Sequence, residues 1–202
     1  MTDCSYICYM RRKIDKESLL EVGTQLLHKQ GYNGTGIKDI ADAAGILKGS
    51  FYNYFKGKEA FCKEALEYYG LKSYEDSKKI LQNKSMSPLT RIKTLFSYRI
   101  NFMISDQNCS KGCFLGNTGQ ELAETNEALR KVINDSFEME NKMFIDCLKE
   151  AKDSKEIRDT LDPIKAATFI NQSWQGALLL MKTSKDEMPL RIFYQMIFEQ
   201  FL

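Results

Sequence analysis

GYNGTGIKDIADAAGILKGSFYNYFKGKEAF, residues 31–61, has the pattern of two short helices joined by a tight turn. Four small or apolar residues in its first half stand three or four positions apart: Ile37, Ile40, Ala41 and Ala44. That spacing places the four side chains on one side of a helix. Gly45 then interrupts the pattern, and glycine adopts the left-handed backbone angles of a turn without a Cβ clash. The stretch therefore predicts a helix-turn-helix.

A second short helix is expected from Leu47 to Tyr54, buried through Phe51 and Phe55. Its other face and the start of the next helix carry small or hydrogen-bonding residues: Lys48, Gly49, Ser50, Tyr52, Asn53, Tyr54 and Lys58. Such a face suits a helix in the major groove, because short polar side chains reach base edges while basic and phenolic groups reach phosphates. The alternative interpretation is a solvated face on a small helical domain.

These residues resemble the DNA-binding segment of TetR/AcrR-type transcriptional regulators. In that family Gly-Tyr, Ile-x-x-Ile-Ala, Ala-Gly, Lys-Gly-x-x-Tyr-x-Tyr-Phe and Lys-Glu recur at these spacings, and the match covers residues 18–66. Gly36 departs from the Ser or Thr that usually caps the second helix, although glycine is an acceptable N-cap and the Thr35 hydroxyl is a substitute. The resemblance implies DNA contacts by six residues: Thr35, Lys48, Gly49, Tyr52, Tyr54 and Lys58. It also implies a homodimer that reads palindromic operator DNA.

The composition fits one large or two small domains in 202 residues, with a net charge of only +2. Residues 1–58 hold nine Lys or Arg against six Asp or Glu, a net charge of +3, which leaves −1 for the rest. The asymmetry agrees with an N-terminal part that contacts DNA. No membrane span or export signal stands out, so a cytoplasmic protein with its six cysteines as thiols is expected.

Helical periodicity continues through the rest of the chain, and no segment shows sustained strand-like alternation. All three prolines, Pro88, Pro163 and Pro189, stand where a helix is expected to begin. The sequence therefore predicts an all-α protein of about nine helices. We expect a helix-turn-helix DNA-binding domain over residues 1–57 and a helical effector-binding and dimerisation domain over residues 58–202.

The central helices are expected to enclose a pocket for a small-molecule inducer of unknown identity, since family members usually have one there. Its predicted lining is mostly apolar with a few polar groups: Phe96, Phe102, Met103, Cys113, Phe114, Asn117, Gln120, Phe144, Phe169 and Trp174. Aromatic residues at helical spacing are, however, more often part of a plain hydrophobic core. The segment 108–130 resembles a subset of the family with a Gly-Cys-Leu/Phe-Leu entry into a mid-body helix.

Cys113 stands at an expected helix start, where the helix dipole and Lys111 favour the thiolate, and Cys109 is a possible resolving thiol. A reactive Cys113 would sense oxidants or electrophiles, whereas a buried cysteine would act only as a small apolar group. The pairs Cys4/Cys8 and Cys109/Cys113 are spaced by three residues, not the usual two, and lack a nearby histidine. We therefore expect no metal site and no cofactor.

The last two helices combine small and large apolar residues that suit a four-helix interface between two subunits: Gly176, Ala177, Leu180, Met181, Phe193, Ile197 and Phe201. The alternative is that these faces belong to the intramolecular core. The sequence thus predicts a homodimeric DNA-binding repressor, released by an inducer or by thiol modification. A helical small-molecule-binding protein or enzyme is the rival class, but His28 is the only histidine and no phosphate loop or catalytic triad stands out.

Overall fold

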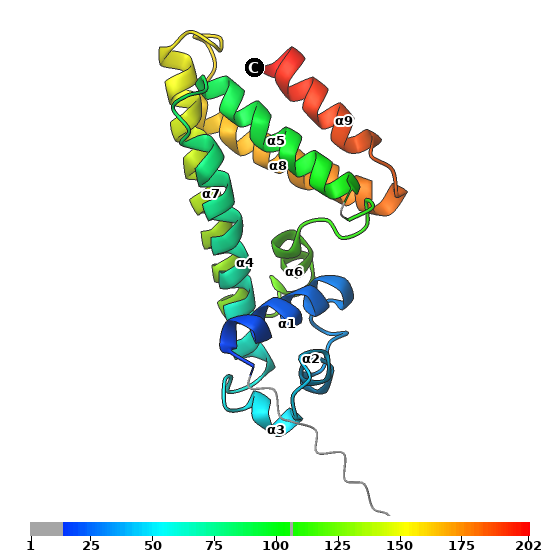
Figure 1. Cartoon of the computed structure of the whole chain (residues 1–202). Helices are drawn as coiled ribbons and strands as arrows, with labels where there is room; N and C mark the ends of the chain where they lie inside the picture. The colour runs from blue at the N-terminus through cyan, green and yellow to red at the C-terminus, as the bar shows by residue number, and fades with distance from the viewer. Residues whose placement is uncertain (1–13, 106) are drawn as a thin grey trace, which may run out of the picture. The chain divides into compact units, whose positions relative to one another are not determined.

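The computed structural model describes residues 14–105 and 107–202, and in this part of the chain it has nine α-helices and no strand (Figure 1). The helices are α1 (Lys16–Gln30), α2 (Ile37–Ala43), α3 (Lys48–Phe51), α4 (Lys58–Leu81), α5 (Pro88–Ser105), α6 (Phe114–Leu122), α7 (Glu127–Asp153), α8 (Pro163–Ser184) and α9 (Met188–Gln195). A π-helical turn, Met196–Phe201, continues α9. The predicted fold class and helix number are confirmed.

The chain forms two compact units, which we call the head, residues up to Ala65, and the body, Leu66–Leu202. The division falls eight residues later than the expected end of the DNA-binding domain at residue 57. The first turns of α4 belong to the head because Phe61 is fully buried there. Its ring lies 4.9 Å from that of Phe55 and 5.6 Å from that of Phe51, measured between ring centroids.

Local signals position the helices of the head. The Asp15 carboxylate accepts the Ser18 N–H at 2.7 Å and caps α1, whose end is marked by Gly31 at φ 78°. Gly45 has φ 68° in the turn after α2, as the sequence predicts for the helix-turn-helix. The turn is closed by the Ile46 N–H, which donates to the Ala41 carbonyl at 2.9 Å.

In the body, α7 packs on α5 and α8, and α8 packs on α9. The centre of its core is the fully buried Phe96, whose ring stacks on Phe144 at 5.4 Å and lies 5.0 Å from Phe193. Asp162 caps α8 by accepting the Ile164 N–H at 2.9 Å, directly before Pro163. Proline costs nothing at this position, because the first N–H groups of a helix have no intrahelical partner.

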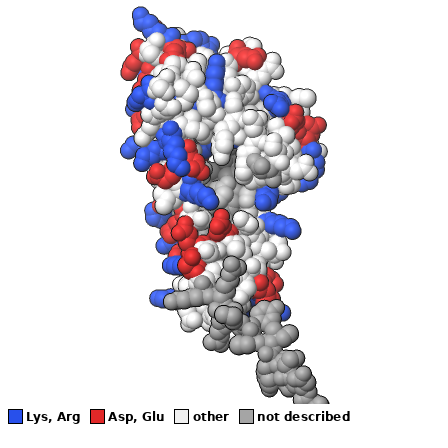
Figure 2. Space-filling model, viewed as in Figure 1, with Lys and Arg blue, Asp and Glu red and all other residues white. Residues whose placement is uncertain are grey.

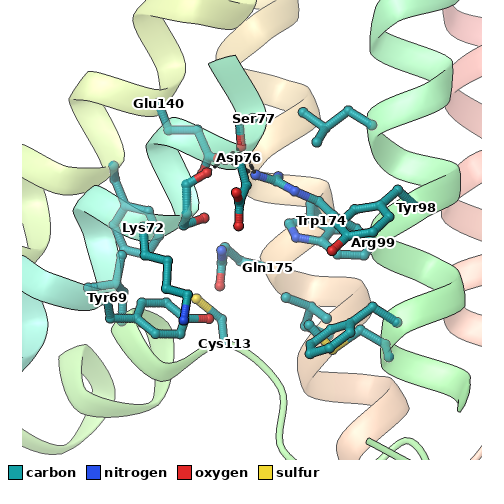
Figure 3. Close-up of a pocket in the computed structure, with 17 residues that line it drawn as sticks. Tyr69, Lys72, Asp76, Ser77, Tyr98, Arg99, Cys113, Glu140, Trp174 and Gln175 are labelled. Atoms are coloured by element: carbon teal, nitrogen blue, oxygen red, sulfur yellow. Dashed lines mark hydrogen bonds and ion pairs between the residues drawn. The ribbon is translucent and has the colours of Figure 1, made fainter. Parts of the chain in front are cut away.

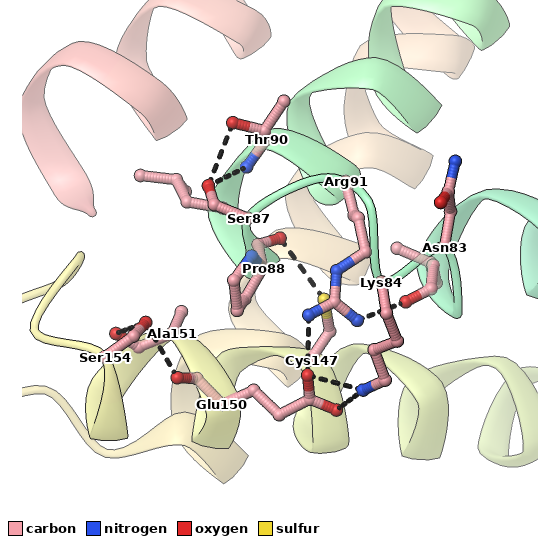
Figure 4. Close-up of polar contacts among 12 residues, drawn as sticks. Asn83, Lys84, Ser87, Pro88, Thr90, Arg91, Cys147, Glu150, Ala151 and Ser154 are labelled. Carbon is pink, nitrogen blue, oxygen red and sulfur yellow. Dashed lines mark hydrogen bonds and ion pairs between the residues drawn. The ribbon is translucent and has the colours of Figure 1, made fainter.

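A buried arginine joins three elements of the body (Figure 4). Arg91 on α5 is 2% exposed, and its guanidinium donates to the Leu81 carbonyl at 2.7 Å and to the Glu150 carboxylate at 2.5 Å. Glu150, on α7, also accepts from the Lys84 ammonium at 2.6 and 2.7 Å. These bonds hold the end of α4 and the start of α5 against α7. We call Arg91, Glu150 and Lys84 the Arg91 cluster.

Candidate nucleic-acid interface and effector pocket

The helix-turn-helix presents an exposed polar surface around α3. Lys48, Gly49, Tyr52 and Asn53 are exposed, and Ser50 is half-buried beside them. We call these five residues the α3 surface. The helix itself is shorter than expected, ending at Phe51, and turns carry the chain through Tyr52 to Tyr54.

Close packing beneath this surface fixes its orientation. Phe51 is 0% exposed and Phe55 is 2% exposed, which confirms the predicted anchors of the second helix. A Cβ added to Gly49 would meet no atom within 4 Å, so the backbone of α3 is open to a partner at that point. The arrangement gives a rigid support with free hydrogen-bonding groups on its outer side.

Three other residues predicted to contact DNA are engaged within the head. The Thr35 side chain is 1% exposed and its hydroxyl donates to the Gly31 carbonyl at 2.7 Å. The Tyr54 hydroxyl donates to the Ile14 carbonyl at 2.7 Å, and the Lys58 ammonium lies 4.1 Å from the centroid of the Tyr32 ring.

The suggestion that Thr35 caps α2 is wrong, because its hydroxyl donates to the carbonyl of Gly31. Gly36 is the N-cap residue, and its backbone N–H donates to the Asp39 carboxylate at 2.7 Å. A capping box normally has two hydrogen bonds, one from the N3 backbone to the N-cap side chain and one from the N-cap backbone to the N3 side chain. Only the second is present here, because glycine has no side chain to accept the first.

The body contains a cavity of about 230 Å³ between α4, α5, α6, α7 and α8 (Figure 3). Four residues predicted for the effector pocket line it: Phe102, Met103, Cys113 and Trp174. The others in the lining were not predicted: Tyr69, Lys72, Ser73, Asp76, Ser77, Leu95, Tyr98, Arg99, Leu115, Phe137, Glu140, Gln175 and Leu178. We call this cavity the inner pocket.

The remaining predicted pocket residues lie elsewhere. Phe96 and Phe144 are fully buried and Phe114 is 1% exposed. These three residues do not line the inner pocket and are part of the hydrophobic core, which was the alternative interpretation. Asn117 donates through its side-chain amide to the Lys111 carbonyl at 2.8 Å. Two further residues also lie outside the inner pocket, Gln120 as an exposed residue and Phe169 on an outer groove.

One pair of charged residues is bonded across the inner pocket. The Arg99 guanidinium on α5 bonds to the Glu140 carboxylate on α7, and donates to the Ser77 hydroxyl at 2.9 Å. Side chains of Arg99 and Glu140 are 13% and 18% exposed. In the sequence, Arg99 and Glu140 could be noticed only as charged residues on mostly apolar helix faces. The fold is needed to show that the two side chains meet.

Cys113 caps α6 and lies in the pocket wall, with its sulfur accepting the Gly116 N–H at 3.4 Å. The expected lowering of its pKa by the helix start is wrong: burial raises the pKa of the thiol, and the Gly116 and Gln175 hydrogen bonds offset this only in part. Burial also raises the pKa of Cys109. Both cysteines are free thiols.

An apolar groove of about 610 Å³ runs along α8 and α9 on the body. Six of the seven predicted interface residues line it: Gly176, Ala177, Leu180, Phe193, Ile197 and Phe201. Met181 is 0% exposed and belongs to the core, so its assignment to an interface is wrong. Large apolar side chains beside the groove face solvent, with Leu180 59% and Ile192 53% exposed. On the face drawn in Figure 2, acidic and basic side chains of the body are interspersed.

None of the helices in residues 14–105 and 107–202 is long and apolar enough to cross a membrane. Within the same ranges no three His, Cys, Asp or Glu side chains are grouped to hold a metal ion. The pair Cys4 and Cys8 lies outside the described residues.

Two family models match the chain. The one described as "Bacterial regulatory proteins, tetR family" covers residues 19–65, and "Tetracyclin repressor-like, C-terminal domain" covers residues 88–197. The chain belongs to the TetR family. This confirms the resemblance seen in residues 18–66 and extends it to the body.

Relatives of this TetR-family chain include the HTH-type transcriptional repressor DhaR of Mycobacterium sp. strain GP1. The two are 34% identical over 193 residues, which cover 96% of this chain and 95% of DhaR. The crystal structure of regulatory protein TetR from Rhodobacter sphaeroides is 27% identical with a TM-score of 0.86, covering 92% of this chain and 98% of that one. The reduced form of Escherichia coli NemR is 25% identical with a TM-score of 0.83, covering 90% and 93%. The TetR-family protein described here is therefore a DNA-binding transcriptional regulator and not an enzyme.

Proposed function

We propose that the protein is a homodimeric repressor that binds a palindromic operator through the α3 surface and leaves it when a small molecule fills the inner pocket. The observation that carries the proposal is the exposed set Lys48, Gly49, Tyr52 and Asn53 on a helix anchored by the buried Phe51. A regulator acting on operator DNA works in the cytoplasm, which is where we place it.

Each residue of the α3 surface has a distinct proposed task. The Lys48 ammonium donates to a phosphate or to guanine, Tyr52 to a phosphate, and Ser50 and Asn53 reach base edges. Gly49 lets the backbone approach the DNA closely, because nothing occupies the space where a Cβ would stand. Thr35, Tyr54 and Lys58 are proposed to act differently, since their side chains are used inside the head. They position the helix-turn-helix, and the backbone near Thr35 and the Lys58 ammonium remain proposed phosphate contacts.

Substitutions on the α3 surface test the DNA interface. Lys48→Ala should weaken binding to every operator variant and reduce the slope of log affinity against log salt by about one, because one phosphate contact is lost. Asn53→Ala should instead change the preference among bases at one position of each half-site. Lys63→Ala, an exposed residue of α4 outside the surface, is the matched control. Unchanged affinity and salt slope for Lys48→Ala in a gel shift would contradict the assignment.

The α8–α9 groove is proposed as the subunit interface. One head contacts too little DNA for strong specificity, and two-fold dimers place two reading helices about 34–36 Å apart. Exposed apolar side chains along a groove are a common mark of an interface in a soluble protein. Leu180→Glu together with Ile192→Glu should give a monomer in analytical ultracentrifugation and lose cooperative operator binding. A variant that stays dimeric would refute this interface.

Release of the operator is proposed to occur by coupling between pocket and heads. A ligand that binds more tightly to the state unable to match the two half-sites shifts the protein towards it. The proposal requires that ligand and operator weaken each other's binding by the same factor. Thiol modification at Cys113 is a second route to the same state, since added bulk in the pocket wall has the effect of a ligand.

A further inference from the structure

Each charged side chain of the inner pocket contacts another residue of the protein. Arg99 is bonded to Glu140 and Ser77, and Asp76 to the Lys79 ammonium at 2.9 Å. The Lys72 ammonium lies 5.9 Å from the centroid of the Tyr68 ring. With Lys72 and Arg99 against Asp76 and Glu140, the lining has no net charge.

Uncharged polar groups come together at one end of this pocket. Figure 3 shows the Tyr69 side chain, the Cys113 sulfur and the Gln175 amide close to one another, on α4, at the start of α6 and on α8. Burial raises the pKa of the Tyr69 hydroxyl and of the Cys113 thiol, so both are neutral at pH 7. The Gln175 side-chain oxygen lies 2.7 Å from where a Cβ on Gly116 would stand, and the Gly116 N–H donates to the Cys113 sulfur at 3.4 Å.

Aromatic and aliphatic side chains form most of the rest of the wall. Trp174 is 4% exposed, while Tyr98 and Phe102 are more open to solvent at 55% and 39%. The cavity of about 230 Å³ is slightly below the range of about 300–1,000 Å³ that is usual for small-molecule pockets. Its contents are therefore limited to a small molecule with an apolar body.

We infer that the inner pocket binds a small uncharged molecule, with its apolar part against Trp174 and one hydrogen-bonding group at Gln175. Lys72 is exposed and the Asp76 side chain is 49% exposed, so a charged ligand paired with either would gain only a contact screened by water. At the mostly buried pair, a carboxylate would have to take Arg99 from Glu140, and an amine would have to take Glu140 from Arg99. Either exchange leaves one partner of a mostly buried ion pair without its counter-charge, which costs more than a single new contact returns. The inference rests on the proposed function, since it names the class of the inducer.

Matched compounds distinguish the classes. Three sets of fragments with one ring and the same number of non-hydrogen atoms would be used: amides and alcohols, carboxylates, and amines. Benzamide, benzoate and 2-phenylethylamine are typical members of the three sets. Trp174 is the only tryptophan of the chain, so its fluorescence reports on this pocket in the full-length protein. We expect the best uncharged fragment to bind at least about tenfold more tightly than the best charged one. Equal or tighter binding of the carboxylates or amines, or no binding by any set, would overturn the inference.

Two variants locate the contact. Gln175→Leu should weaken the best uncharged fragment at least fivefold, and Gln175→Glu should shift the preference towards amines. Gln172→Leu, an exposed position one turn earlier on α8, should change neither. If Gln175→Glu leaves the ranking of the three sets unchanged, the polar end of the ligand does not face this residue and the inference fails.

The test separates the ligand class from the repressor mechanism. Fragment binding is measured without DNA, and operator release is measured afterwards by gel shift with the best fragment. An uncharged fragment that binds but does not release the operator contradicts the proposed induction and supports the ligand class. Release by a charged fragment with the opposite binding order contradicts the ligand class and supports induction.

Discussion

Removing the Glu150 carboxylate from the Arg91 cluster should lower the free energy of unfolding by an amount that can be worked out from the structure. In Glu150→Leu the Arg91 guanidinium keeps its bond to the Leu81 carbonyl and loses its counter-charge, while remaining 98% buried. Removing one partner of a buried pair costs about 3–5 kcal/mol. The Glu150 side chain is 41% exposed, so water replaces part of the interaction, and we expect about 2–3 kcal/mol.

Thermal unfolding measures this loss. For a protein of this size each kcal/mol lowers the melting temperature by about 2–4 °C, so the variant should melt about 4–12 °C below the parent. Lys84→Ala, which removes the 67% exposed partner of the same carboxylate, is the control and should change the melting temperature little.

The double variant decides whether the physical reason is correct. If the cost comes from an uncompensated buried charge, Arg91→Met combined with Glu150→Leu should be more stable than Glu150→Leu alone. A double variant that is as unstable as the sum of the two single variants would refute this reasoning and indicate lost packing instead.

The pH dependence gives an independent check. Hydrogen bonds from Arg91 and Lys84 hold the pKa of Glu150 below its usual value. A lowered folded-state pKa adds stability above the unfolded-state pKa, and this is lost as the pH falls through the folded value. The free energy of unfolding of Glu150→Gln should therefore change less than that of the parent below about pH 4.3.

Three further outcomes are expected. Gly23→Ala should destabilise the head by about 1–3 kcal/mol and weaken DNA binding, because its Cβ would stand 2.2 Å from a Phe61 ring carbon; an unchanged melting curve would contradict this. Gly49→Ala should keep or slightly raise stability, since its Cβ meets nothing, while operator affinity falls; equal affinity would show that the backbone does not approach DNA there. Alkylation of Cys113, followed by peptide mass mapping, should reach its plateau rate at a higher pH than alkylation of a free cysteine, whose pKa is about 8.5, because burial raises the pKa of the Cys113 thiol; a plateau at the same or a lower pH would argue against burial.

Most of the helix positions could be predicted because the signals are local. Asp162-Pro163 marks the start of α8, and Asn126 caps α7 by accepting the Leu129 N–H. Such contacts reach only two or three residues along the chain, so a single sequence contains them. The length of α3 was overestimated because Tyr52 and Asn53 are compatible with a helix, and only the packing of the head turns the chain there.

The pocket was harder to predict than the fold for a physical reason. Phe96 and Trp174 both follow helical spacing and both are buried, yet only Trp174 reaches the inner pocket. Whether a buried ring faces a cavity depends on the side chains opposite, which come from other helices. The contribution of α4, through Tyr69 and Asp76, could not be inferred from a helix with apolar and charged residues distributed around it.

The placement of Phe61 affects how a minimal DNA-binding fragment has to be cut from this chain. A fragment ending at residue 57 would lack the ring that closes the aromatic cluster of Phe51 and Phe55. Helix α3 would then lack the packing beneath Phe51, in a fragment already so short that its folding is marginal. Extending the fragment beyond Ala65, so that it includes the first turns of α4, restores the packing of Phe61 that supports α3.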